Sequence, residues 1–154
     1  MKAFLLTALL LASTAVQAHD FEKDDLVIVH PVALSTSVDA DKATETIGYF
    51  KVRNTSKQAD RLLSISAPET SELIQINILP VDEPGVAKQA VSALDIPGKQ
   101  ETALTPNGNH ILFSKLKTPL AADYSFPATL TFERAGDIPV IFSVESASEP
   151  QIHN

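Results

Sequence analysis

The chain has 154 residues, a net charge of −7 at pH 7 and no cysteine. An acidic chain is poorly suited to bind nucleic acid or anionic lipid. Without cysteine there is no disulfide framework and no thiolate that could bind a metal or act as a nucleophile. Met1 is the only methionine, so the chain contains no sulfur once its first residues are removed.

The first 18 residues have the features of an export signal. Lys2 provides the positive charge, residues 3–16 are mostly apolar, and Val16-Gln17-Ala18 offers small residues for cleavage. The apolar run is too short for a good membrane span, so no membrane insertion is expected after cleavage. Cleavage after Ala18 would make His19 the new N-terminus.

The remaining chain predicts a series of short strands. Residues 19–25 read as a polar lead-in, Pro31 is expected to end or edge the first strand, and residues 35–46 read as a loop. Apolar runs and period-2 alternation predict strands over residues 26–29, 47–53, 60–66, 72–79, one or two within 86–96, from His110 onward, 128–133 and 138–144.

About eight short strands without helical periodicity are typical of a β-sandwich or a small barrel. We therefore expect a single all-β domain over residues 19–146, followed by a disordered tail over residues 147–154.

One histidine stands between a predicted turn and a predicted strand. Pro106-Asn107-Gly108-Asn109 has turn chemistry, and a strand is expected to begin at His110. A side chain in that position should be partly exposed and held on rigid backbone, which suits a metal ligand or a hydrogen-bonding group. A structural or surface histidine is the alternative interpretation.

Several segments carry a family resemblance in their order and spacing. They are Asp25-Leu-Val-Ile-Val-His-Pro31, Gly48-Tyr-Phe-Lys-Val-Arg-Asn-Thr55, Asp60-Arg-Leu-Leu63, Ser66-Ala-Pro68, Gly108-Asn-His110, Leu116-Lys-Thr-Pro-Leu120 and Ala128-Thr-Leu-Thr-Phe-Glu-Arg-Ala-Gly136. Over nearly the whole mature chain they resemble periplasmic copper chaperones of the PCuAC type. The resemblance implies a cupredoxin-like Greek-key β-sandwich and copper handling in the periplasm. The implied partner is a copper-accepting subunit of a respiratory oxidase or another copper chaperone.

The resemblance also implies a Cu(I) site made of a histidine and a methionine after Ser-x-Pro, together with a later His-x-Met pair. His110 matches the second histidine, but Leu112 stands in place of its methionine. The first histidine would fall at about Ile76, and residues 74–109 contain no His or Met. A site centred on His110 would therefore be nitrogen-based and favour Cu(II) over Cu(I). It should weaken as pH falls through the imidazole range near about 6.5.

Two further histidines are candidate metal ligands. His19, as a mature N-terminus, would offer an α-amine and an imidazole to Cu(II). His30 precedes Pro31 at a strand margin and resembles the His-Pro of the family. The alternatives are an arbitrary polar N-terminus for His19 and a packing role for His30.

An enzymatic function has little support in the sequence. The chain has no Gly-x-Ser-x-Gly motif and no nucleophilic cysteine. Two histidines on a β-sandwich resemble the copper brace of polysaccharide-cleaving oxidases, but no Trp and only two Tyr leave few aromatic side chains for a sugar-binding face. We therefore expect a non-enzyme. A divergent family member that has lost metal binding and acts as an interaction module in the cell envelope stays the second hypothesis.

Overall fold

The computed structural model describes residues 20–36, 44–80, 85 and 87–147. The predicted signal peptide, His19, and residues 148–154 of the predicted tail lie outside the described residues. The described chain contains strands and no helix, and none of it could cross a membrane as a long apolar helix. The strands are β1 (Phe21–Lys23), β2 (Leu26–Leu34), β3 (Glu45–Asn54), β4 (Asp60–Ser66), β5 (Ser71–Ile78), β6 (Gln89–Val91), β7 (Leu94–Ile96), β8 (Gln100–Ala103), β9 (His110–Leu116), β10 (Ser125–Phe132) and β11 (Gly136–Glu145).

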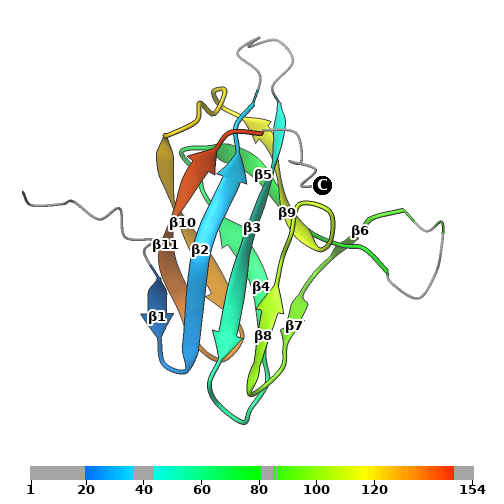
Figure 1. The fold of residues 1–154 in the computed structure, drawn as a ribbon, viewed down its shortest axis with the longest axis vertical. Helices are drawn as coiled ribbons and strands as arrows, with labels where there is room; N and C mark the ends of the chain where they lie inside the picture. The colour runs from blue at the N-terminus through cyan, green and yellow to red at the C-terminus, as the bar shows by residue number, and fades with distance from the viewer. Residues whose placement is uncertain (1–19, 37–43, 81–84, 86, 148–154) are drawn as a thin grey trace, which may run out of the picture.

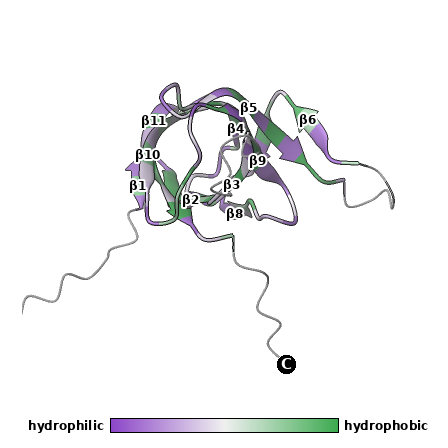
Figure 2. Cartoon of the chain, turned by 90° about the horizontal axis from the view of Figure 1, so that it is seen from above, coloured by the Kyte–Doolittle hydropathy of each residue, from purple (hydrophilic) through white to green (hydrophobic). Residues whose placement is uncertain are grey.

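All the strands belong to one sheet that curls round its own core. The order is β6-β5-β9-β3-β2-β11-β10-β4-β7, with β1 paired to β2 and β8 paired to β3. Viewed from above, the strands form a ring, and β6 extends away from it (Figure 2). This arrangement confirms the expected all-β Greek-key sandwich, whose two layers are the halves of a nearly closed barrel.

Two features of this topology place the candidate site. The pairing of β2 with β11 is parallel, whereas the other pairings are antiparallel. Strands β8 and β9 share one edge of β3, β8 along Lys51–Asn54 and β9 along Glu45–Gly48 (Figure 1). The segment that joins β8 to β9, residues 104–109, therefore leaves the edge of β3 after Lys51, and the chain pairs with β3 again at Gly48.

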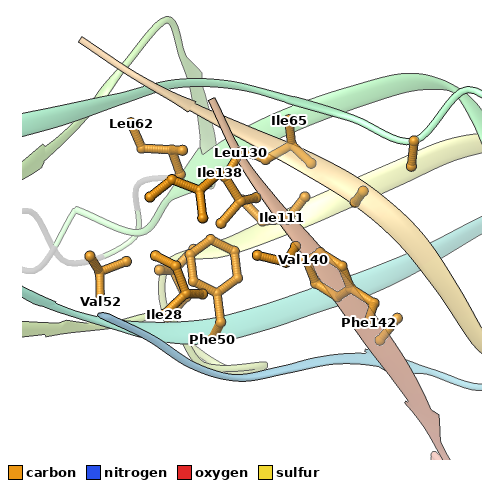
Figure 3. Packing of buried hydrophobic residues seen from close by; sticks show 14 of the residues in the cluster. Ile28, Phe50, Val52, Leu62, Ile65, Ile111, Leu130, Ile138, Val140 and Phe142 are labelled. Carbon is orange, nitrogen blue, oxygen red and sulfur yellow. The ribbon is translucent and has the colours of Figure 1, made fainter. Parts of the chain in front are cut away.

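The core follows from strict alternation along the long strands. Every second residue of β11 from Ile138 to Val144 is buried, as the period-2 pattern predicted. Phe50 and Phe142 lie among aliphatic side chains from several strands (Figure 3). Their rings meet edge to face with centroids 6.0 Å apart, and Phe113 and Phe126 extend the same aromatic cluster.

Three local expectations were wrong. β1 forms within the predicted polar lead-in and pairs with β2, and β8 was not predicted. Strand β2 does not end at Pro31, because a bulge between Val29 and Val32 shifts the register and lets the pairing with β3 resume. Proline is tolerated at such a bulge because no ladder hydrogen bond is needed there.

Gly48 allows β3 to pass close to the aromatic cluster. A Cβ atom at this position would overlap Cε2 of Phe113 and lie 3.3 Å from Cε1 of Phe142. We expect Gly48→Ala to lower the free energy of unfolding by about 1–3 kcal/mol, since the buried ring must move. Urea denaturation measures this loss. In the background of Phe113→Leu, Gly48→Ala should cost less, and an equal cost in both backgrounds would contradict the steric explanation.

Candidate metal centre

His110 is the first residue of β9, as predicted, but it is not partly exposed. Only 2% of its surface is exposed. Its neighbours Ile111 and Phe113 point into the core, so alternation places His110 on the outer face of the sheet. On that face it is opposite Asn77 of β5, which pairs on its other side with Ala90 of β6. The expectation of partial exposure was wrong because β9 is an interior strand of the sheet, paired on one side with β5 and on the other with β3.

The hydrogen bonding of His110 orients its imidazole. Nδ1 donates to the carbonyl oxygen of Gly108 at 2.8 Å, and since a carbonyl only accepts, the proton is on Nδ1. Among the described residues, Nε2 has no hydrogen-bond partner. Metal-binding histidines typically donate one ring N–H to a carbonyl and present the other nitrogen to the ion.

The positions around His110 do not form the soft site of copper chaperones. Leu112, two residues along the same face, is opposite Gln75, and His110 is opposite Asn77. These amides offer oxygen donors, which are harder than thioethers and do not suit Cu(I). The residues opposite and beside His110 therefore do not form the sulfur-rich site that the resemblance implied.

His30 lies in the bulge of β2, in a different part of the same sheet. Its φ is 50°, and its Nε2 is 3.0 Å from Oε1 of Glu145 in β11. β11 and β9 flank opposite sides of the β2–β3 pair, so the structure does not bring His30 together with His110. His19 and His153 are outside the described residues.

Tyr49 lies between these two places. It is paired with Val32 of β2, and it follows Gly48, whose partner on β9 is Ile111, the residue after His110. Partial burial raises the pKa of the Tyr49 phenol above its usual 10.0, and the negative charge of Glu145 raises it further. Tyr49 and Glu145 are therefore close enough on the outer face to interact.

The raised pKa predicts a specific loss of stability in alkali. Because folded Tyr49 holds its proton more tightly than the unfolded chain does, its contribution is complete below pH 10.0 and is lost as pH rises beyond that value. We expect Tyr49→Phe to remove this part of the alkaline destabilisation in urea unfolding series. Tyr124→Phe, which alters the other and more exposed tyrosine, is the matched control. Identical profiles for the two variants would contradict the prediction.

No group of three or more His, Cys, Asp or Glu side chains that could hold a metal ion occurs in the described part of the chain. Sequence reasoning missed Asn77, Gln75, Tyr49 and Glu145 as neighbours of the predicted histidines. The period-2 pattern placed some of them on strands, but only the order of the strands in the sheet brings them together.

Solved structures with the same fold include copper-binding domains. The chain superposes on the copper-bound PCuAC domain from PmoF2 with a TM-score of 0.71 and 20% identity, covering 83% of this chain and 98% of that one. The apo form of that domain gives a TM-score of 0.70 and 22% identity, covering 85% and 98%. Cu(I)-bound DR1885 from Deinococcus radiodurans gives 0.61 and 19%, covering 77% and 78%. No curated protein sequence matches the chain significantly.

These structural likenesses establish that the fold is the PCuAC fold. At the level of sequence, residues 15–144 match one family model, described as "Putative lipoprotein LpqE-like". That match spans nearly all of the described strands, from β1 to all but the last residue of β11. The chain therefore belongs to the LpqE-like family and has the PCuAC fold.

Proposed function

We propose that this protein is exported and handles copper, binding Cu(II) through His110 and passing it to a copper-accepting protein in the periplasm, such as a respiratory oxidase subunit or another copper chaperone. The observation that carries the proposal is the imidazole of His110, whose Nδ1–H donates to the Gly108 carbonyl and whose Nε2 has no hydrogen-bond partner among the described residues. The PCuAC fold supports copper as the metal, since a PCuAC domain of PmoF2 has been solved with copper bound.

The surroundings of His110 favour Cu(II) as the oxidation state. Asn77 of β5 is opposite His110, and Leu112 is two residues further along β9. Neither position therefore offers His110 a thioether or a second imidazole as a co-ligand. Imidazole and amide oxygen suit Cu(II) better than Cu(I). One imidazole alone binds weakly, and His19 with its α-amine would complete the donor set if cleavage follows Ala18. A site of this kind binds through neutral imidazole and weakens in acid.

A titration of the mature protein with Cu(II) and Cu(I) tests the proposal. We expect one equivalent of Cu(II) to be lost in His110→Ala, and a weaker affinity when one extra residue precedes His19. Asn109→Ala changes the adjacent turn residue, whose side chain accepts from the Leu79 amide, and leaves the imidazole in place as a control. Cu(I) bound tightly, with no change in His110→Ala, would refute this site.

A gain of function gives an independent test. Leu112 is two residues beyond His110 on the same face of β9, where the resemblance implies a methionine. Leu112→Met should therefore raise the affinity for Cu(I) in competition with a chromogenic Cu(I) chelator. Leu116→Met, on the same strand but further from His110, is the matched control. Equal Cu(I) affinities for the two variants would show that position 112 does not face the site.

A metal-free interaction module is the alternative function. It is favoured by the burial of His110 and by Leu73, a large apolar side chain that is 42% exposed on β5. In this alternative neither Cu(II) nor Cu(I) binds stoichiometrically to the mature protein. Stoichiometric copper that depends on His110 excludes it.

A further inference from the structure

The turn that precedes β9 carries an Asn-Gly pair at the surface. It lies in the loop of residues 104–109 between β8 and β9 (Figure 1), where the N–H of Gly108 donates to the carbonyl oxygen of Thr105 at 3.1 Å. This hydrogen bond closes a four-residue turn in which Asn107 is the third residue. The side-chain hydrogen bonds of the loop within the described chain come from the two residues after the turn. The exposed side chain of Asn107 is therefore not held by one.

An asparagine side chain that precedes glycine can react with its own main chain. The amide nitrogen of the glycine attacks the side-chain carbonyl carbon, a succinimide ring forms, and the former side-chain nitrogen leaves as ammonia with the proton of the attacking amide. Water then adds to either carbonyl of the ring, which opens to aspartate or isoaspartate. A side chain on the second residue hinders the attack, and glycine has none. The reaction consumes only water and requires no oxidant or reductant.

The other asparagines of the described chain do not meet these conditions. Asn54 is buried, and its amide nitrogen donates to backbone carbonyls. Asn77 is buried on β5. The Oδ1 atom of Asn109 accepts from the backbone N–H of Leu79 at 2.9 Å. All three are followed by a residue with a side chain, so only Asn107 among the described asparagines combines an exposed, unbound side chain with a following glycine.

The middle of the turn is only weakly restrained. The attack requires the N–H of Gly108 to leave the Thr105 carbonyl, because the nitrogen must approach the side chain of Asn107. One backbone hydrogen bond in an exposed turn opposes this movement, and exposed turns open locally at a much lower free energy than core strands do. The N–H of Thr105 donates to the carbonyl of Asn109 at 2.8 Å, so the ends of the turn stay together while its middle opens.

We propose that Asn107 is a site of non-enzymatic deamidation and that the modification changes the setting of His110. The carbonyl of Gly108, the residue whose nitrogen reacts, accepts the Nδ1–H of His110 at 2.8 Å. Isoaspartate adds a carbon atom to the main chain immediately before Gly108, so this carbonyl is displaced and the imidazole loses the partner that fixes its tautomer. Aspartate keeps the main chain unchanged and adds only a negative charge. The modification itself does not rest on the function proposed above, whereas its effect on copper does.

Incubation of the folded mature chain in heavy-oxygen water tests the modification. The incubation lasts until Asn107 is fully converted in a parallel sample unfolded in urea, and mass spectrometry of digested peptides then locates the label. We expect label at residue 107 of the folded protein, in both aspartate and isoaspartate, and none at Asn109. Asn107→Gln should lower the conversion at least about tenfold, because its longer side chain is less well placed for the attack.

Gly108→Ala is the second variant. Its Cβ would lie 2.7 Å from Oγ1 of Thr105, a hydroxyl that can rotate away, and it should also slow the conversion because it hinders the attacking nitrogen. An unlabelled residue 107 in the folded protein would overturn the proposal, as would equal labelling of Asn107 and Asn109.

The effect on His110 is measured on the modified protein, which ion exchange separates by its added negative charge. Nitrogen NMR shifts of the imidazole report which ring nitrogen carries the proton. We expect the Nδ1–H form to be lost in the isoaspartate protein and kept in Asn107→Asp, which reproduces the charge alone. Unchanged imidazole shifts in the isoaspartate protein would overturn the link to His110.

A Cu(II) titration of the same samples separates this inference from the proposed function. We expect the isoaspartate protein to differ in Cu(II) affinity from the unmodified chain, and Asn107→Asp to differ less. If the unmodified chain binds no copper, the proposed function fails, while labelling of residue 107 and the NMR change still support the modification and its link to His110.

Discussion

Phe142→Ala is expected to lower the free energy of unfolding by about 4 kcal/mol. The ring is fully buried and contacts three others, with centroids 5.4 Å from Phe113, 5.4 Å from Phe126 and 6.0 Å from Phe50. Truncation removes the buried area and the edge-to-face contacts, and it leaves a cavity bounded by rings that cannot collapse into it. Chemical denaturation with urea measures the change.

The neighbouring residue provides the control for this prediction. Ile141 is on the same strand, but its side chain points outward and is 42% exposed. Ile141→Ala should cost much less, about 1 kcal/mol, because its side chain is only partly removed from water on folding and its truncation leaves no enclosed cavity. Comparable losses for the two variants would mean that the aromatic cluster is not the centre of the core. The free energy of unfolding of a stable domain is about 5–15 kcal/mol in total, so the loss expected for Phe142→Ala would be a large part of it.

Asp60→Ala is expected to lower the free energy of unfolding by about 3 kcal/mol or more. The carboxylate begins β4 and is 4% exposed. Its Oδ1 accepts from the backbone N–H groups of Arg61 at 2.7 Å and Arg134 at 2.9 Å, and Oδ2 accepts from Ala135 at 3.1 Å. These hydrogen bonds link the turn between β10 and β11 to the start of β4. Removing the Asp60 carboxylate leaves the backbone N–H donors without partners.

Asp95 gives a matched substitution with the opposite expectation. Its side chain is 82% exposed and pairs with Arg61 at 3.2 Å. Exposed ion pairs contribute little, so Asp95→Ala should change stability by less than about 1 kcal/mol. Thermal melts of the two variants side by side measure the difference. If Asp60→Ala and Asp95→Ala had the same melting temperature, the backbone hydrogen bonds to Asp60 would not be a main contribution to the stability of the turn.

The strands that the sequence predicted well are those that bury one face. In β3, β5 and β11 the alternation is visible because each inward residue contributes to the core. β1 and β8 were missed because they are short and largely polar, and they are strands only by virtue of backbone pairing with β2 and β3. Pairing of that kind leaves no hydrophobic pattern in the sequence.

The sequence located the candidate histidines but could not indicate their neighbours. Turn chemistry before His110 correctly marked the start of β9. Its tautomer is fixed by the Gly108 carbonyl, and the residue opposite it, Asn77, comes from another strand. The partnership of His30 with Glu145 joins residues 115 positions apart, and nothing local to either residue indicates it. Proximity across strands is set by the order of strands in the sheet, which local patterns do not encode.

The parallel pairing of β2 with β11 has a consequence for how the chain acquires its structure. β2, the first long strand, pairs on one side with β11, the last strand of the chain, which ends at Glu145. The barrel therefore cannot close until almost the whole chain is available, and contacts so distant in sequence make closure slow. A chain emerging from the ribosome would stay open until its synthesis is nearly complete. Such a delay is compatible with the export proposed above, in which the chain would cross a translocation channel as an extended polypeptide and fold afterwards.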